Sequence, residues 1–276
     1  MGWHGHLQLS YRRADRSTVL LDRHEGPLRV LQSLYPEGPA VCHNVLVHPP
    51  GGLVGGDVLT LDATLTANTH ALLTTAGATR FYRSTGPLAA QTVRARLDSG
   101  ARLEWLPLET IAFSGCQAAS SLRFELAAGA ETIGWDVLAL GLPASEQPFE
   151  RGRYTQSIEL PGRWLERGVI DASDRRLLDS PLGFAGQRTL GVLWFAAGDA
   201  LHDARRESLL DAARDIIADD ALARTAGVTA PQPEVVVLRV LAPGVEPAIG
   251  LLTKVWRAWR EGVWGLAACV PRVWRT

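Results

Sequence analysis

Three acidic side chains stand among apolar neighbours of the kind found in buried strands. Glu104 lies in LEWLP, Glu109 follows in the same segment, and Asp136 comes directly after Trp135. A buried carboxylate needs a partner or a polar path, because an ionised group loses its hydration inside a protein. We favour a pair with one of the many arginines. The alternative is a polar path in which carboxylates transiently hold a hard or borderline metal cation.

Histidine and cysteine residues near position 45 offer a second kind of metal ligand. Cys42, His43 and His48 lie close together in the sequence. Neighbours in a strand point to opposite faces, so Cys42 and His43 cannot face one ion without a bulge. His48 could bind a metal or cap the end of its strand. The sequence contains neither HExxH nor CxxC, so a closed structural zinc site is not expected.

The glycine-rich segment HPPGGLVGGD, from His48 to Asp57, raises the question of phosphate binding. Gly51 and Gly56 have the spacing of a Walker loop, but Asp57 occupies the lysine position and Val58 the hydroxyl position. A carboxylate there repels phosphate, and the next residues alternate like a strand. Paired glycines permit positive φ angles and the close approach of another segment. We therefore predict a backbone corner and not a nucleotide site.

Basic and aromatic residues alternate in the C-terminal segment. Within a predicted helix over 247–262, four of them are Trp256, Arg257, Trp259 and Arg260. Tryptophan and arginine are enriched at protein interfaces, so these four are candidates for partner binding. The same composition suits single-stranded nucleic acid. A helix packed into the core, with a solvated arginine face, explains the pattern equally well.

The overall composition is that of an ordinary globular protein. Of the 276 residues 46% are hydrophobic, and the net charge of −1 argues against a general nucleic-acid binder. No apolar run is long enough to span a bilayer, and the N-terminus does not resemble a signal peptide. Three widely spaced cysteines favour a reducing, cytoplasmic setting. The chain contains no G-x-S-x-G or other familiar catalytic motif.

The elements that position these residues begin with a weak internal repeat. An alternating strand, a turn and a new apolar run recur three times, and the new runs start at Ala71, Ala101 and Ala130, which are 30 and 29 residues apart. A fixed period of this size favours stacked strand–turn–strand coils. A β-sandwich with evenly spaced hairpins is the alternative. We predict a mainly β, β-helix-like (solenoid-like) single domain over residues 1–276.

Two α-helices are predicted in the C-terminal third. The second begins near Pro247 and ends at Gly262. Between the helices the run VVVLRVLA, residues 235–242, is almost continuously apolar, and RTLGVLWFAA over 188–197 is similar, which is typical of strands buried on both faces. The apolar stripe of the first helix comprises Leu209, Leu210, Ala213, Ile216 and Ile217.

Five segments, taken together and in order along nearly the whole chain, resemble the urease accessory protein UreD family, also called UreH. They are YPEGPAVCHNVLVHPPGGLVGGD (35–57), TTAGATRFYRS (74–84), LEWLPLET (103–110), the Trp135-Asp136 pair and PRVWRT (271–276). Three positions depart from the family pattern. Leu108 stands where glutamine is frequent, Arg80 where lysine is frequent, and Leu142 where arginine is expected.

The resemblance implies a mostly β stack of strands with two helices and no catalysis of its own. It implies a scaffold or chaperone that binds apo-urease and recruits UreF and, through it, the GTPase UreG, so that nickel enters the urease active site. It also implies an internal polar passage, with no tightly bound cofactor and no nucleic-acid or membrane partner. The residues expected to hold nickel transiently are His43, His48, Asp57, Glu109 and Asp136, and those expected to contact UreF are Trp256, Arg257, Trp259 and Arg260.

Two other classes of function remain open. A β-helix-type enzyme for small molecules would use paired carboxylates for acid–base work. It predicts a deep pocket with two close carboxylates, one of them with a raised pKa. A binder of single-stranded nucleic acid would depend on the arginines and tryptophans of the C-terminal segment.

Overall fold

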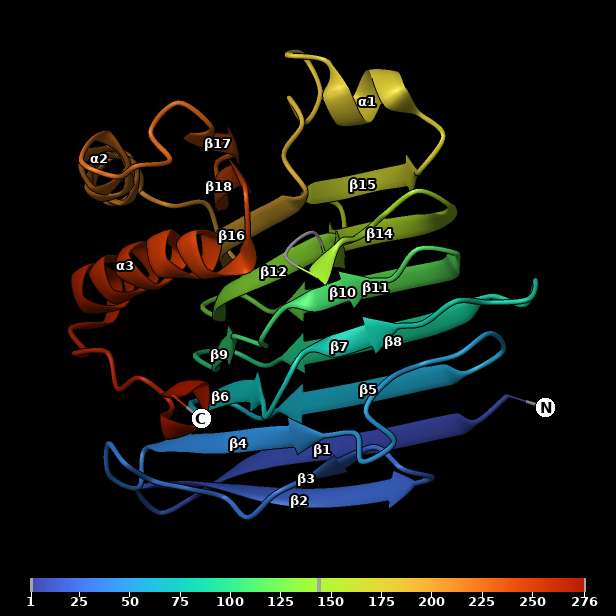
Figure 1. Cartoon of the computed structure of the whole chain (residues 1–276). Coiled ribbons are helices and arrows are strands. Elements are labelled where there is room, and N and C mark those ends of the chain that lie inside the picture. The colour runs from blue at the N-terminus through green and yellow to red at the C-terminus, as the bar shows by residue number, and fades with distance from the viewer. Residues whose placement is uncertain (1, 143–144, 276) are drawn as a thin grey trace.

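The strands of the protein form two large sheets, and within each sheet the strands are stacked one above another in Figure 1. The structure, a computed structural model, describes residues 2–142 and 145–275. The seven-stranded sheet has the order β15-β14-β11-β8-β5-β1-β2. Its strands are β1 (His4–Ala14), β2 (Ser17–Glu25), β5 (Val58–Leu65), β8 (Ala89–Leu97), β11 (Cys116–Leu126), β14 (Gly152–Leu160) and β15 (Trp164–Asp171).

The eleven-stranded sheet has the order β17-β18-β16-β12-β9-β6-β4-β3, with short strands β10 and β13 paired to β12 and short strand β7 paired to β10. Its main strands are β3 (Arg29–Val30), β4 (Val41–Val47), β6 (His70–Thr75), β9 (Arg102–Trp105), β12 (Glu131–Leu142), β16 (Thr189–Ala197), β17 (Ala226–Gln232) and β18 (Val235–Ala242). The short strands are β7 (Thr79–Phe81), β10 (Thr110–Ala112) and β13 (Gln147–Pro148).

Successive coils of the chain stack in parallel, which confirms the solenoid-like prediction over the hairpin sandwich. Leu61 of β5 lies opposite Val93 of β8, and Val93 lies opposite Leu122 of β11, so the coils are 32 and 29 residues long. Strands β4, β6, β9 and β12 are likewise parallel. The first coil exceeds the period inferred from sequence because the corner between β7 and β8 is longer than that between β10 and β11.

The parallel stack is extended at its margins by antiparallel strands. The β1–β2 hairpin lies at one end of the seven-stranded sheet, and β15 pairs with β14 at the other. In the second sheet β16, β18 and β17 continue from β12 as antiparallel neighbours. These additions place a hairpin or a covering segment, not a bare coil, at each end of the stack (Figure 1).

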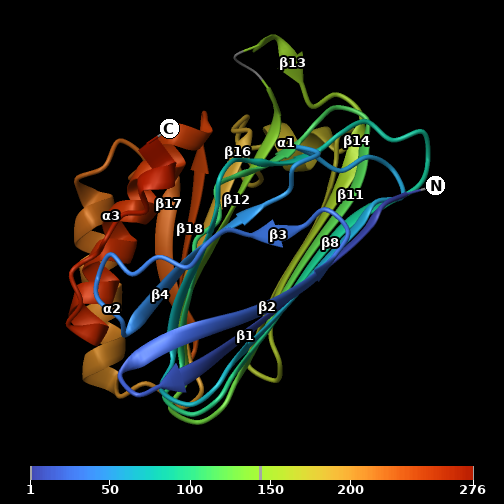
Figure 2. The same ribbon diagram turned by 90° about the horizontal axis from the view of Figure 1, so that it is seen from below.

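Helices α2 and α3 cover one side of the eleven-stranded sheet, whereas its other side faces the seven-stranded sheet (Figure 2). The two long helices are α2 (Asp203–Ala218) and α3 (Val245–Trp264), which confirms the pair predicted from sequence. Helix α3 runs past the predicted end at Gly262 and stops at Gly265, which adopts a left-handed φ of 63°. Helix α1 (Arg175–Asp179) is a single short turn, and residues 272–275 form a 3₁₀ turn. None of the described helices is long and apolar enough to cross a membrane.

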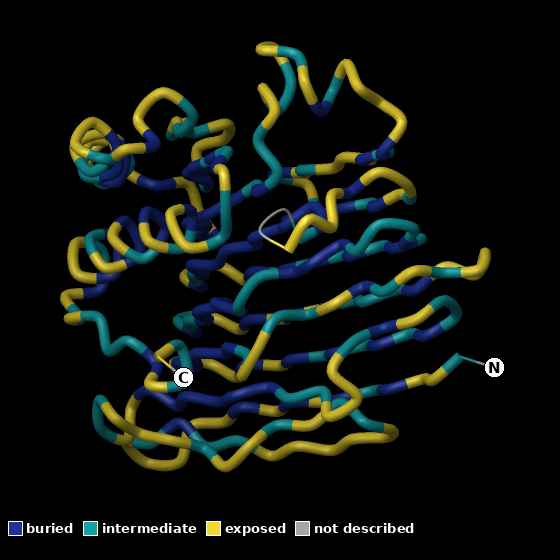
Figure 3. Tube along the Cα trace, in the orientation of Figure 1, coloured by how far each residue is buried: buried dark blue, intermediate teal, exposed yellow. Residues whose placement is uncertain are grey.

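Strands β12, β16 and β18 are therefore buried on both faces, as their dark blue colour in Figure 3 shows. Ile133, Trp135 and Val137 pack with the helices. The intervening Asp136 faces the seven-stranded sheet, where it meets Gln156 of β14. This burial explains why the sequence of β18 is apolar at every position except Arg239 and does not alternate.

Candidate functional site

The glycine-rich segment between β4 and β5 is a backbone corner. Its N–H groups are occupied by main-chain carbonyls: Gly51 donates to His48, Leu53 to Arg80 and Gly56 to Leu88, at 2.8, 2.7 and 3.0 Å. Gly51 and Gly56 have positive φ angles of 78° and 95°. A phosphate cradle needs free N–H groups, and these donors already have acceptors within the fold.

Asp57 closes this corner. Its carboxylate accepts hydrogen bonds from the backbone N–H groups of Trp3 and Val54, each at 2.8 Å. The side chain is buried and ties the N-terminal residues to the corner. The structure thus gives Asp57 an architectural role, and a role in holding nickel stays a prediction.

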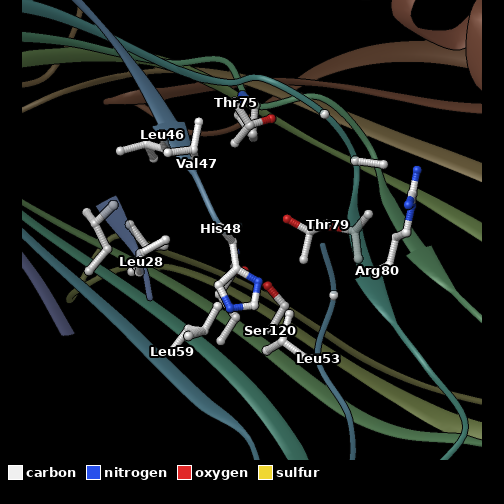
Figure 4. A pocket seen from close by; sticks show the side chains of 18 of the residues that line it. Leu28, Leu46, Val47, His48, Leu53, Leu59, Thr75, Thr79, Arg80 and Ser120 are labelled. Carbon is white, nitrogen blue, oxygen red and sulfur yellow. The ribbon is translucent and has the colours of Figure 1, made fainter. Parts of the chain in front are cut away.

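A cavity of about 320 Å³ lies between the two sheets beside this corner. Exposed residues of the segments 48–52 and 76–80 form its rim. His48 stands at the centre of the opening and points toward Leu59 and Ser120 (Figure 4). Burial lowers the pKa of His48, although the negative charge of Asp57 opposes that shift. This shift favours the neutral imidazole, which is able to accept a hydrogen bond or ligate a cation.

Asp136 is the carboxylate of this cavity. Its side chain is buried, and one oxygen accepts a hydrogen bond from Nε2 of Gln156 at 2.7 Å. Burial raises the pKa of Asp136, and the donors Gln156 and the Val137 N–H only partly offset this. Asp136 forms no ion pair with any residue in the described part of the chain. The favoured arginine pairing is therefore wrong for Asp136.

Glu104 shows the opposite arrangement on the helix side of the same sheet. It is fully buried, and Arg260 of α3 donates from Nε to both carboxylate oxygens at 3.1 Å. Trp256 Nε1 donates to Glu104 at 2.7 Å, and His70 Nε2 lies 2.8 Å from it. Burial alone would raise the pKa of Glu104, but the hydrogen bond and charge of His70, followed by Arg260 and Trp256, lower it. The predicted pairing of a buried acid with arginine is confirmed here.

Arg260 continues the chain of contacts to Glu37. Its Nη2 donates to Glu37 at 2.6 Å, and His43 Nε2 lies 2.6 Å from the same carboxylate. Burial tends to raise the pKa of Glu37, and the hydrogen bonds from His43 and Arg260 outweigh it and lower the pKa. We call the five residues His70, Glu104, Arg260, Glu37 and His43 the buried ion network.

Three of the four predicted partner-binding residues lie inside the molecule. Trp256, Trp259 and Arg260 are at most 1% exposed. Trp259 donates from Nε1 to the carbonyl of Leu209 in α2 at 2.8 Å. The apolar stripe of α3 faces the sheet and α2, which is the core-packing alternative considered from sequence. Arg257 alone of the four is exposed to solvent.

The predicted nickel residues are dispersed, and only two share a cavity. His48 and Asp136 line the inter-sheet cavity, His43 belongs to the buried ion network, and Asp57 closes the corner. Glu109 is half-buried, and its carbonyl accepts from the Thr79 N–H at 2.9 Å. Across residues 2–142 and 145–275, no three His, Cys, Asp or Glu side chains converge as a metal site. Transient nickel binding at these five positions stays a prediction.

The cavity also bears on the paired-carboxylate enzyme. Asp136 has the raised pKa which that hypothesis requires, but it is the one carboxylate among the described residues that line the cavity. Acid–base work by two carboxylates needs a second such group close by. The geometry of this cavity does not supply it.

Sequence reasoning missed His70 and Glu37 as parts of the buried ion network. The Arg260–Glu104 contact joins residues 156 positions apart, so the sequence predicts an arginine partner for Glu104 without identifying which one. Glu37 lies in a turn-like segment, where a solvated carboxylate is the ordinary expectation. The one available signal was the position of Arg260 on the apolar stripe of a predicted helix, directly after Trp259.

Comparison with known proteins places the chain in a family. The family model described as UreD urease accessory protein matches residues 4–275. A urease accessory protein UreD from Leptothrix cholodnii is 63% identical over 279 residues, with all of both chains covered. Those from Variovorax paradoxus and Paracidovorax citrulli are each 60% identical, with 100% and 99% of both chains covered respectively. The chain belongs to the UreD family of urease accessory proteins.

Proposed function

We propose that this chain is a urease maturation factor that acts in the cytoplasm as a non-catalytic scaffold or chaperone. In this proposal it binds apo-urease and recruits UreF and, through UreF, the GTPase UreG. Nickel then reaches the urease active site within the assembled complex. The observation that carries the proposal is the match to the UreD family over residues 4–275, supported by relatives that are named urease accessory proteins.

The scaffold part of the proposal is tested by co-expression with the urease structural subunits, UreF and UreG. We expect a tagged form of this chain to co-purify with apo-urease and UreF, and with UreG only when UreF is present. Recovery of UreG without UreF would contradict the order of recruitment. Failure to recover any urease subunit would contradict the scaffold itself.

Arg257 is the exposed member of the four residues proposed to meet UreF. Charge reversal at the rim of an interface weakens association, so Arg257→Glu should reduce the recovery of UreF. Arg214→Glu is a matched control, because Arg214 is an exposed arginine on the neighbouring α2. Equal recovery of UreF with both variants would remove Arg257 from the proposed interface.

The nickel part of the proposal assigns transit to the inter-sheet cavity, with His48 and Asp136 as its polar groups. Asp136→Asn keeps an acceptor for Gln156 and removes the charge, so it should lower urease activation in cells while complex assembly stays intact. Asp62→Asn, on the half-exposed outer side of β5, is the control. Full activation by Asp136→Asn together with full activation by His48→Ala would contradict passage through this cavity.

A further inference from the structure

The inter-sheet cavity combines apolar walls and several threonine and serine side chains with one buried carboxylate. Its floor includes Leu61, Val93, Trp105 and Leu122, all of which are buried. The volume of about 320 Å³ falls at the lower end of the range for small-molecule sites. The rim segments are exposed, so a ligand has a route to this floor from solvent.

The carboxylate of Asp136 has a hydrogen-bond partner but no positively charged neighbour among the described residues. Its hydrogen-bond partner Gln156 is a neutral amide, and no cationic side chain of the described residues lies within ion-pair distance. Glu104, buried to a similar degree on the other face of the same sheet, has Arg260. Ionised carboxylates inside proteins are normally paired, because burial without a counter-charge costs several kcal/mol. A cation bound beside Asp136 would therefore stabilise the ionised form of its carboxyl group, which burial disfavours.

The remaining lining favours an organic cation. Among the described residues no three His, Cys, Asp or Glu side chains converge here to hold a metal ion in place, whereas the leucine and valine side chains match an apolar ligand body. Trp105 adds an aromatic surface, against which a cation or an apolar body can pack. Arg80, the cation at the rim, has its guanidinium pointing away from His48 (Figure 4).

We propose that the inter-sheet cavity binds a small organic cation, a primary ammonium on a compact aromatic or aliphatic body, with the ammonium on Asp136 and the body against Trp105 and the leucines. The site uses the same cavity and the same carboxylate as the proposed nickel path, but its test does not depend on urease maturation. It requires only the cavity and the charge of Asp136, both of which belong to the isolated chain.

Isothermal titration of the isolated full chain with 2-phenylethylamine tests the proposal, and 2-phenylethanol serves as the uncharged counterpart. We expect saturable binding of the amine and at least about tenfold weaker binding of the alcohol. Asp136→Asn should reduce amine affinity by about tenfold or more, whereas Asp62→Asn, an acidic residue outside the cavity, should leave it unchanged. Circular dichroism verifies that each variant is folded.

A second variant tests the location without altering charge. Val93→Phe fills part of the cavity and retains Asp136, so it should weaken the binding of the amine. Equal affinity for amine and alcohol, unchanged amine affinity in Asp136→Asn, or no saturable binding to the wild-type chain would each overturn the proposal. None of these results would bear on recruitment of urease or UreF, which is measured separately by co-purification.

Discussion

Two buried carboxylates on one sheet show how the neighbouring charge decides the behaviour of a residue. Glu104 and Asp136 are both embedded in apolar segments, and both lie in strands of the eleven-stranded sheet. Arg260 and His70 lower the pKa of Glu104 despite its burial, whereas burial without a cation raises the pKa of Asp136. One residue therefore holds two layers of the fold together, and the other keeps a polar group available in a cavity.

Removal of Arg260 should be among the most damaging single changes in the molecule. Arg260→Gln leaves the buried Glu104 and the half-buried Glu37 without their shared cation, and breaking a buried ion pair from one side costs about 3–5 kcal/mol. Urea unfolding followed by tryptophan fluorescence measures the loss. Arg257→Gln, one turn away and exposed, should change the free energy of unfolding by no more than about 0.5 kcal/mol. Equal stability of the two variants would contradict the importance of the network.

The buried ion network also predicts how stability depends on pH. The pKa values of Glu104 and Glu37 are lowered in the folded protein from an ordinary value of 4.5. The stabilisation that these two ionised carboxylates give the folded state is therefore fully present above the unfolded pKa. It is lost as the pH falls through the lower pKa of the folded protein. We expect the free energy of unfolding to decrease on acidification below about pH 4.5. In Arg260→Gln the arginine no longer opposes the effect of burial, so the pKa values of Glu104 and Glu37 should be higher than in wild type. The two carboxylates then become neutral at a higher pH, and the difference in free energy of unfolding between variant and wild type should shrink between pH 7 and pH 4. A deficit that stays constant over this range would contradict the assignment.

At the scale of elements, strands and helices with regular sequence patterns could be predicted. The elements against which each of them packs could not. Strand β18 and helices α2 and α3 follow from apolar runs and stripes that each element carries in its own sequence. The coil period is visible because each coil repeats the same strand and turn, although the longer corner after β7 shifts it by two residues. Helix α1 has a single turn, which is too short to show periodicity.

The candidate sites were only partly predictable, for the same physical reason. Asp136 and His48 were singled out from local sequence, but their common cavity arises from the stacking of strands far apart in the chain. The interface role of α3 was ambiguous, because tryptophan and arginine suit a core stripe as well as a surface. Packing against α2 and the sheet settles where Trp256 and Trp259 lie, and local sequence carries no information on that packing.

The corner between β4 and β5 yields a test at the level of one element. A Cβ atom added at Gly52 would lie 2.3 Å from the Tyr82 ring and 2.9 Å from the Arg80 carbonyl, so Gly52→Ala forces the neighbouring segment to move. We expect a loss of about 1–3 kcal/mol in thermal or urea unfolding. Gly77→Ala, on the opposite rim, meets no atom within 4 Å and has an ordinary φ angle, so it should be nearly neutral. Similar losses for both variants would contradict the close approach at Gly52.

At the scale of the whole molecule, a stack of coils has two ends that must not expose strand edges. The β1–β2 hairpin pairs with β5 at one end, where Leu7 and Leu9 continue the core formed by Leu61 and Leu65. Interior coils bury one another, and terminal units of solenoids protect the last coil from solvent and from other chains. The hairpin is therefore expected to act as a cap for the parallel stack.

Deletion of residues 2–25 should convert the protein into a self-associating one. The deletion leaves β5 as an edge with a full row of unpaired N–H and C=O groups beside the exposed apolar side chains of its inner face, which is a template for pairing with another chain. Size-exclusion chromatography with light scattering should report large assemblies or little soluble protein. Leu21→Ser alters an exposed position of β2 without removing the hairpin, so it should elute like wild type. The deletion variant could instead be soluble and monomeric and unfold cooperatively at the wild-type midpoint. That result would show that the stack needs no cap at this end, and that the inter-sheet core alone holds the inner coils in register.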